Sequence, residues 1–237
     1  MKYAELREPV YEANRILGES GLVVLTWGNV SGVDRNRSLM AIKPSGVSYR
    51  ELQPEDVVIL DLETGETIDG TMQPSSDTRT HLEIYRAFRG VYGVVHTHSP
   101  FATAWAQMRR GIPVYGTTHA DSFYGMVPVT RLLTDQEVKE DYERETGRVI
   151  VEHFRKNRIE PLEMPAVLLP GHGPFTWGVS PAKAVENAVV LEEVARIASY
   201  MGALQNSAEP LPDFYLEKHY QRKHGPAAYY GQSKEET

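Results

Sequence analysis

The sequence contains no cysteine. This absence excludes a disulfide scaffold, a Cys-ligated zinc site and a cysteine nucleophile, so any bound metal needs histidine and carboxylate ligands. Long apolar runs are missing too, since no stretch approaches the roughly 18 residues of a membrane span. The first residues, MKYAELREPVYEAN, are amphipathic and lack the apolar core of a signal peptide. We therefore expect a cytoplasmic protein with no membrane partner.

An excess of basic residues is the third absence, because 25 Lys and Arg stand against 32 Asp and Glu and give a formal net charge of −7. Proteins that bind nucleic acids usually carry a basic stripe, so we expect no nucleic-acid partner. Locally placed groups could still bind one small phosphate. The 237 residues, 41% of them hydrophobic, suffice for one large domain or two small ones, and no long linker divides them.

The hydrophobic pattern predicts both helices and strands. Helical spacing occurs at residues 6–17, 78–89 and 181–198, and a Thr-x-x-Glu capping box at 134–137 predicts an exposed helix before a separate apolar pattern at 148–154. Short apolar runs predict strands at residues 22–26, 39–43, 56–62, 91–98 and 166–169. Because helices and strands do not alternate strictly, we expect one α/β domain around a mixed sheet.

The most informative chemical motif is the His-x-His of His96 and His98 at the end of a predicted strand. Side chains two residues apart on a strand project from the same face, so both imidazoles can reach one cation. His172 lies between two glycines after another predicted strand, and three histidines are typical of a catalytic metal site. Asp77 is a candidate fourth ligand or a carboxylate that orients a ligand. Exposed or structurally satisfied histidines are the alternative interpretation.

Small polar residues at predicted element ends could bind a phosphate group. These residues are Gly28, Asn29, Ser45, Gly46, Ser75 and Ser76, and Lys43 lies beside them. Backbone N–H groups exposed by small residues can point at an anion, and hydroxyl groups add donors. For any one of these pairs, ordinary turn formation and helix capping are the more common explanation, and a lysine near a strand end is usually just solvated.

Acid–base candidates lie in the THAD segment that ends at Asp121 and near the C-terminus at Tyr230. Asp121 could instead cap a turn, and a tyrosine so close to the end of a chain is normally a packing residue. His219 and Arg222 make the tail locally basic, which suits an anionic substrate or a solvated helix. The residues alone thus indicate a metal site beside an anion pocket and leave the reaction open.

Seven separated motifs occur in order along the chain: LTWGNVSGVD, IKPSGVSY, PSSDTRTH, VVHTHSPFATAWA, GTTHADSFYG, GHGPFTWG and KHYQRKHGPAAYYGQ. Together they resemble the class II, metal-dependent sugar-phosphate aldolase and epimerase family. The resemblance implies a single-domain α/β/α sandwich around a central, mostly antiparallel sheet over residues 1–232. It also implies a homotetramer whose active sites lie between adjacent subunits and are reached by the tail at 212–232, with disorder at 233–237.

The same resemblance assigns roles to residues of this sequence. It implies one Zn²⁺ per subunit at His96, His98 and His172, with Asp77 on or beside it, and an acid–base pair of Asp121 and Tyr230. Substrate contacts would fall on Gly28, Asn29, Lys43, Ser45, Gly46, Ser75, Ser76, His219 and Arg222. Family aldolases typically carry Glu where this chain has Asp77, which favours an epimerase.

The implied activity is the interconversion of L-ribulose 5-phosphate and D-xylulose 5-phosphate by cleavage and re-formation of the C3–C4 bond, in arabinose or ascorbate catabolism. One alternative is an aldolase that cleaves a ketose 1-phosphate such as fuculose or rhamnulose 1-phosphate. Another is a non-catalytic interaction domain of the same fold. That alternative lacks the metal-binding histidines, which this sequence retains.

Overall fold

The structure is a computed structural model that describes residues 1–204 and 208–230, so the predicted disordered segment 233–237 lies outside the described residues. The helices are α1 (Ala4–Glu19), α2 (Thr78–Ala87), α3 (Pro100–Gln107), α4 (Thr117–Ala120), α5 (Asp135–Asn157), α6 (Pro181–Leu204) and α7 (Asp213–His224), with a 3-10 turn η1 (Pro54–Asp56). The strands are β1 (Asn29–Asp34), β2 (Leu39–Ile42), β3 (Val58–Asp61), β4 (Thr67–Asp69), β5 (Gly93–His96), β6 (Ala166–Leu168) and β7 (Pro174–Gly178). None of the described helices has the length and apolarity needed to cross a membrane.

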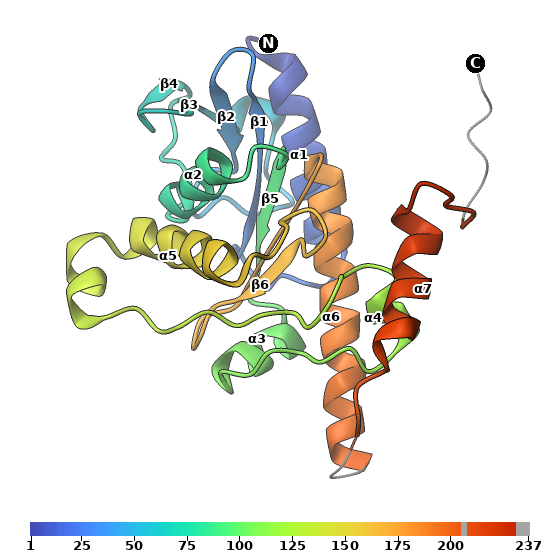
Figure 1. The fold of residues 1–237 in the computed structure, drawn as a ribbon. Helices are drawn as coiled ribbons and strands as arrows, with labels where there is room; N and C mark the ends of the chain where they lie inside the picture. Colours follow the sequence, from blue (N-terminus) through green and yellow to red (C-terminus); the bar gives the residue numbers. More distant parts are fainter. Residues whose placement is uncertain (205–207, 231–237) are drawn as a thin grey trace.

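The strands of the described residues form one sheet in the order β4-β3-β2-β1-β5-β7-β6. Every neighbouring pair of these strands is antiparallel. Helices α1 and α6 cover one face, and α2 and α5 cover the other (Figure 1). The predicted α/β/α sandwich is confirmed, but the mixed sheet expected from the pattern is wrong. Strands β1 to β4 follow one another as antiparallel neighbours, without the crossover helices that parallel pairs need.

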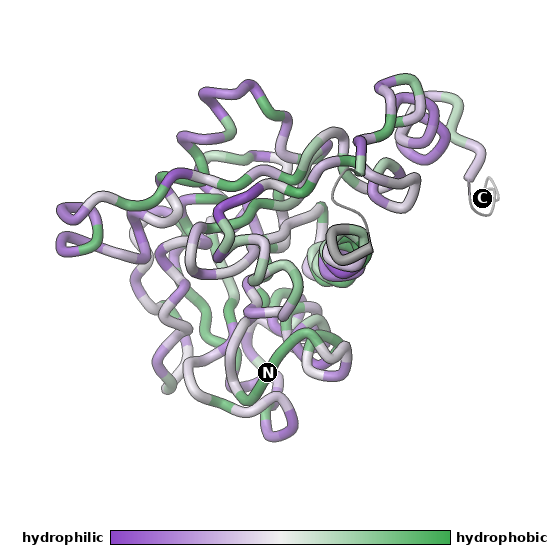
Figure 2. Tube along the Cα trace, turned by 90° about the horizontal axis from the view of Figure 1, so that it is seen from below, coloured by the Kyte–Doolittle hydropathy of each residue, from purple (hydrophilic) through white to green (hydrophobic). Residues whose placement is uncertain are grey.

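The alternation of side chains along β5 decides which way the site faces. Val95 packs with α1 and α6, in a cluster that includes Leu17 and Ala184. Val94 faces the opposite side and belongs to the main core. His96 has the same parity as Val94, so its ring emerges on the face that α2 and α5 cover. Figure 2 shows hydrophobic segments through the middle of the molecule and hydrophilic ones at its rim.

One local prediction needs correction. The run at residues 22–26 is a turn, because the Val24 carbonyl accepts a hydrogen bond from Trp27 N at 3.0 Å and Leu25 has a φ of 56°. The first strand begins only at Asn29. The two separate patterns expected around residues 134–154 are confirmed, because non-helical backbone at Asp141 divides α5 into two helical segments, the first of which begins at the predicted capping box of Thr134.

Asn14 connects the first helix to the strand that carries Asn29. Its fully buried side chain accepts a hydrogen bond from Val30 N at 2.9 Å and donates to the carbonyls of Val30 and Val10 at 3.0 and 2.8 Å. Such a side chain satisfies backbone groups that would otherwise be buried without a partner. The side-chain amide of Asn14 therefore fixes the start of β1 to α1.

Replacing Asn14 by alanine should lower the free energy of unfolding by about 1–3 kcal/mol, because Val30 N–H is left buried without this acceptor. Urea unfolding followed by circular dichroism measures the change. Glu8→Ala, on the exposed side of the same helix, is the control and should change stability little. Equal effects of the two substitutions would contradict the role of Asn14.

Candidate metal centre and active site

Three imidazoles converge at the end of β5. The ligand nitrogens of His96, His98 and His172 all lie within 4.8 Å of one another. His96 and His98 come from β5 and the residues after it, and His172 from the turn between β6 and β7, so the β5–β7 pairing brings them together. Three nitrogen donors around one point are a suitable ligand set for a catalytic divalent metal with an open coordination position.

The environment of His96 fixes how its ring is used. Its Nδ1 lies 2.9 Å from the carbonyl oxygen of Pro174, which can only accept, so Nδ1 carries the proton. Its Nε2 is buried and has no hydrogen-bond partner among the described residues. A buried lone pair without a partner is costly unless something binds it. The His96 environment therefore fits a metal ion at Nε2.

The other two histidines are held in the neutral form that metal binding needs. Burial, and then the neighbouring His96, lowers the pKa of His172 to about 4. The same two causes lower the pKa of His98, although its side chain is more exposed. The Tyr142 hydroxyl lies 3.4 Å from His172 Nδ1. This contact leaves Nε2 of His172 free to face the other two imidazoles.

A hollow of about 520 Å³ surrounds the three imidazoles. Most of the residues predicted for the site line it: Gly28, Asn29, Lys43, Ser45, Gly46, Ser75, Ser76, Asp77, His96, His98 and His172. The structure thus brings the two predicted features, a histidine cluster and an anion pocket, into one cavity. The sheet order explains this convergence. Strand β1, which begins at Asn29, lies between β2, which ends just before Lys43, and β5, which ends at His96.

Asp77 lies beside the histidines and is held by an amide. Asn29 Nδ2 donates to Asp77 Oδ2 at 2.7 Å and to Ser75 Oγ at 2.9 Å. Burial acts to raise the pKa of Asp77, but His96, His81 and the Asn29 hydrogen bond together keep it below its usual value. The carboxylate is therefore ionised next to the cluster, where it can bind or orient a cation.

Lys43 brings a positive charge to the lining of the hollow. Its ammonium group donates to the carbonyls of Pro44 and Val47 and lies 4.9 Å from the centre of the Tyr49 ring. Burial lowers its pKa to about 8, so most of the population stays charged at neutral pH. Tyr49 also donates to the Gly28 carbonyl at 2.7 Å, which ties the two loops that flank the lysine.

The remaining predicted residues form a separate cluster between α4 and α7. Asp121 accepts from Arg222 Nε and Nη2 at 3.0 and 2.6 Å, and from His219 Nδ1 at 3.0 Å. The Arg222 guanidinium lies 5.0 Å from the centre of the Tyr230 ring, which is 60% exposed. This cluster contributes nothing to the described lining of the hollow. Helix α7 lies at one edge of the molecule, and the far end of α5 lies at the other (Figure 1).

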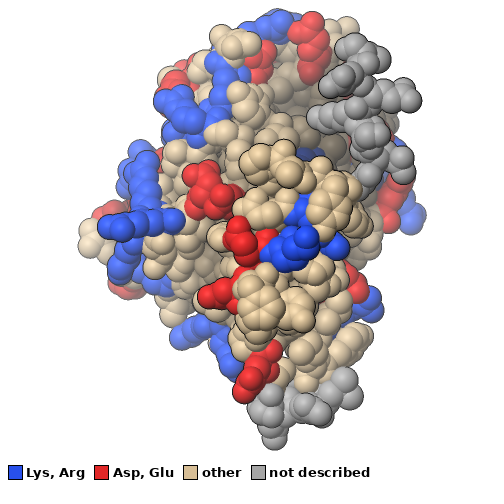
Figure 3. Space-filling model, turned by 45° about the vertical axis from the view of Figure 1, so that its right-hand side comes forward, with Lys and Arg blue, Asp and Glu red and all other residues tan. Residues whose placement is uncertain are grey.

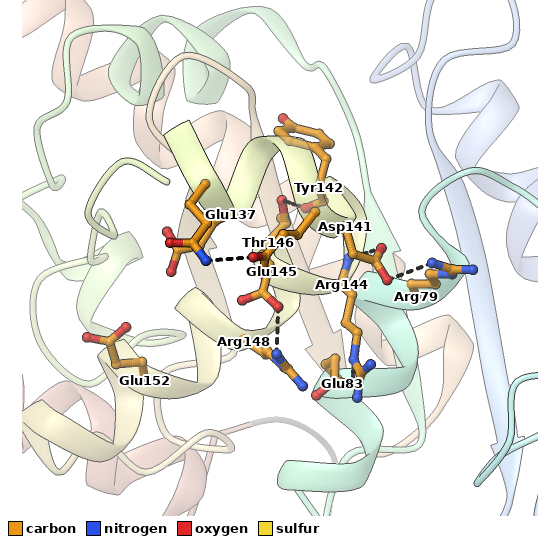
Figure 4. A network of polar contacts seen from close by, with 12 residues as sticks. Arg79, Glu83, Glu137, Asp141, Tyr142, Arg144, Glu145, Thr146, Arg148 and Glu152 are labelled. Carbon is orange, nitrogen blue, oxygen red and sulfur yellow. Dashed lines mark hydrogen bonds and ion pairs between the residues drawn. The ribbon is translucent and has the colours of Figure 1, made fainter. Parts of the chain in front are cut away.

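Five residues that line the hollow were not predicted: Thr26, Trp27 and Pro44 adjoin predicted residues in the sequence, whereas Tyr142 and Glu143 do not. Tyr142 and Glu143 follow the non-helical Asp141 in α5. The Asp141 carboxylate accepts a hydrogen bond from Arg79 Nη1 of α2 at 2.6 Å (Figure 4). The interruption turns this part of α5 toward the histidines. The polar pattern of the segment predicts only an exposed helix, so no local signal could have placed Tyr142 near His172.

Comparisons with known proteins identify relatives of this chain. A family model described as Class II Aldolase and Adducin N-terminal domain matches residues 8–199. The chain is 49% identical to the L-ribulose-5-phosphate 4-epimerase UlaF of Salmonella paratyphi B over 228 residues, which cover 96% of this chain and 99% of the relative. UlaF of Salmonella typhi gives the same identity and coverage.

Two solved structures are similar over most of the chain. An L-fuculose 1-phosphate aldolase has a TM-score of 0.74 and 25% identity, covering 94% of this chain and 97% of the other. The L-fuculose-1-phosphate aldolase of Thermus thermophilus has a TM-score of 0.64 and 27% identity, covering 88% and 100%. The family resemblance read from the seven motifs is confirmed.

Removing one imidazole should strongly weaken metal binding without unfolding the protein. We expect His98→Asn to weaken zinc binding by more than about a hundredfold, because even outer partners of ligating histidines are worth about ten- to a hundredfold. Calorimetric titration of chelator-stripped protein with zinc measures the affinity. His153→Asn, on α5 outside the hollow, is the matched control. Unchanged affinity in His98→Asn would remove this residue from the metal centre.

Proposed function

Because this chain belongs to the class II aldolase and adducin family, we propose that it is a metal-dependent epimerase that interconverts L-ribulose 5-phosphate and D-xylulose 5-phosphate. The observation that carries the proposal is the single hollow in which three imidazoles face a basic, hydroxyl-rich pocket. The names of its relatives at 49% identity support the same substrate. A ketose phosphate needs both halves of this hollow, one for the ketose oxygens and one for the phosphate.

The reaction requires a carbon–carbon bond to break, because the hydrogen on C4 is not acidic. Removal of the proton from the C4 hydroxyl lets the C3–C4 electron pair move toward C2, which gives the enediolate of dihydroxyacetone and glycolaldehyde phosphate. Turning the aldehyde and re-forming the bond to its other face inverts C4, and a returned proton completes the product. A divalent ion held by His96, His98 and His172, for which we propose zinc, supplies Lewis acidity worth several kcal/mol to the developing negative charge.

The loops around Lys43 and Ser75 would bind the phosphate of the aldehyde fragment, so that its aldehyde carbon can turn while the fragment stays bound. Lys43 supplies a charge, Ser45 and Ser75 supply hydroxyl groups, and Gly46, with a φ of 70°, lets the backbone come close to an anion. These contacts lie at the far end of the fragment from the reacting carbon. Asn29 and the ionised Asp77 border the enediolate half, and a side chain as short as Asp77 suits an enzyme that must not protonate that carbon.

We assign the acid–base pair, Asp121 and Tyr230, to the pocket of an adjacent subunit in a homotetramer. Within one chain both residues lie in the cluster between α4 and α7 rather than in the hollow. Burial acts to raise the pKa of Asp121, but Arg222 and His219 outweigh it and lower the pKa, so Asp121 is ionised, which is the form that a general base requires. Tyr230 is exposed and can donate one to the C4 oxygen.

The face around α7 is suited to a second copy of the chain. Four aromatic side chains there are between 45% and 69% exposed: Phe214, Tyr215, Tyr229 and Tyr230. Figure 3 shows this side of the molecule, where Lys and Arg side chains meet Asp and Glu in the middle of a largely uncharged face. Exposed aromatic groups with a few charges are typical of a surface that another subunit covers.

The cytoplasmic location remains a prediction from the sequence.

The purified protein should convert L-ribulose 5-phosphate into D-xylulose 5-phosphate, lose this activity with a chelator and regain it with zinc. A coupled assay for the product and a second assay for free aldehyde measure the two outcomes. His153→Asn serves as a control that keeps activity. Accumulation of free aldehyde would favour an aldolase, and full activity in a metal-free preparation would contradict the proposal.

A shared site predicts that two inactive variants can rescue each other. His98→Asn and Tyr230→Phe should each be nearly inactive, yet subunits mixed one to one and reassembled should regain about one quarter of the wild-type activity. This fraction follows because one site in four pairs an intact pocket with an intact neighbouring tyrosine in a cyclic tetramer.

The control for this mixing experiment pairs His98→Asn with His172→Asn, which damage the same half of the site and should give no recovery. Absence of recovery with Tyr230→Phe, while hybrids are seen by native mass spectrometry, would place Tyr230 in its own subunit's site or outside the mechanism.

A further inference from the structure

Helix α3 begins two residues after His98, with Ser99 at the N-cap and Pro100 at the first helical position. An N-cap side chain normally accepts a hydrogen bond from the second or third helical N–H. Here the buried Ser99 side chain makes no such bond among the described residues. The first turn of α3 therefore needs an acceptor from elsewhere in the fold.

Glu192 of α6 supplies that acceptor. Its Oε1 accepts from Phe101 N at 2.8 Å, and its Oε2 accepts from Ala102 N at 2.9 Å. These are the second and third helical residues, which an N-cap would ordinarily serve. A carboxylate at this position also interacts favourably with the helix dipole, and both hydrogen bonds are charge-assisted. One side chain, 90 residues away from Ala102 in the sequence, thus holds the start of α3.

The same helix supports the loop that carries His172. Gly171 N donates to the Ala106 carbonyl of α3 at 3.2 Å. Gly173 packs so closely that an added Cβ would lie 3.4 Å from Thr103 Oγ1 and 2.7 Å from the Thr97 carbonyl. Helix α3 is therefore continuous with one ligand, His98, and in contact with the glycines on both sides of another, His172.

We propose that Glu192 is a positioning residue for the metal centre. By fixing the first turn of α3 from α6, its carboxylate sets where His98 and His172 lie relative to His96. His96 does not depend on this contact, because the strand pairing of β5 and its bond to Pro174 hold it. This inference rests on the metal centre of the proposed function.

The test compares Glu192→Gln with Glu193→Gln, because Glu193 pairs with Arg196 on the exposed side of the same helix. Zinc affinity is measured by competition with a chromogenic chelator, and ligand geometry by the visible spectrum of the cobalt(II)-loaded protein. Urea unfolding of the metal-free proteins reports general stability. A purely structural cap would change stability but would leave the cobalt spectrum of the folded protein as it was.

We expect Glu192→Gln to weaken zinc binding by about tenfold, as outer partners of metal sites commonly do, and to shift the cobalt bands in a folded protein. Glu193→Gln should change neither. Glu192→Asp keeps the charge but is too short to reach both N–H groups, so it should give a similar loss and replaces the Gln variant if that fails to fold.

The possible failures are distinct. Wild-type protein that binds neither zinc nor cobalt would contradict the proposed metal centre itself. Wild-type binding together with unchanged affinity and an unchanged cobalt spectrum in Glu192→Gln would overturn only the role of Glu192. Loss of the fold in both Glu192 variants would also overturn it, because the residue would then serve general stability.

Discussion

The hydrogen bond between His96 Nδ1 and the Pro174 carbonyl is the contact on which the site depends. It joins the end of β5 to the start of β7, two residues beyond His172, so two ligand-bearing segments are held by one contact. It also fixes the tautomer of His96 and directs the Nε2 lone pair into the hollow. The His96 ring stacks on the ring of Phe175, its register partner in β7, with 4.3 Å between the ring centroids. This stacking supports the same orientation. Without the hydrogen bond to Pro174, the tautomer of His96 is no longer fixed.

Charge is divided between two places in the fold. The hollow holds the neutral imidazoles of His98 and His172, the ionised carboxylate of Asp77 and a lysine whose pKa burial lowers to about 8. The cluster between α4 and α7 holds a carboxylate that Arg222 and His219 keep ionised. In the proposed tetramer, the first place binds the substrate and the second moves the proton at C4. A division of this kind makes the assembled oligomer, rather than the folded chain, the active unit.

Local patterns predicted that three histidines could share one site, because period two in a strand places His96 and His98 on one face and glycines allow His172 a sharp turn, and the three do lie together. Their convergence depends on the pairing of β5 with β7, which no local pattern encodes, and β7 itself, PFTWG, was not predicted as a strand. The run at 22–26 resembled a strand more than the polar, glycine-containing β1 that follows it. Tyr142 and Glu143 reach the hollow only through the interruption at Asp141. The ion pair of Asp121 with Arg222 spans 101 residues, so only tertiary structure or family resemblance could join them.

The central claim is that three imidazoles bind one divalent ion. X-ray absorption spectroscopy of the zinc-loaded protein at the zinc edge tests it most directly. Ligation by His96, His98 and His172 predicts three imidazole nitrogens at about 2.0–2.1 Å from zinc, with the outer-ring scattering that histidine ligands produce. A first shell of oxygen atoms alone, without imidazole scattering, would contradict it.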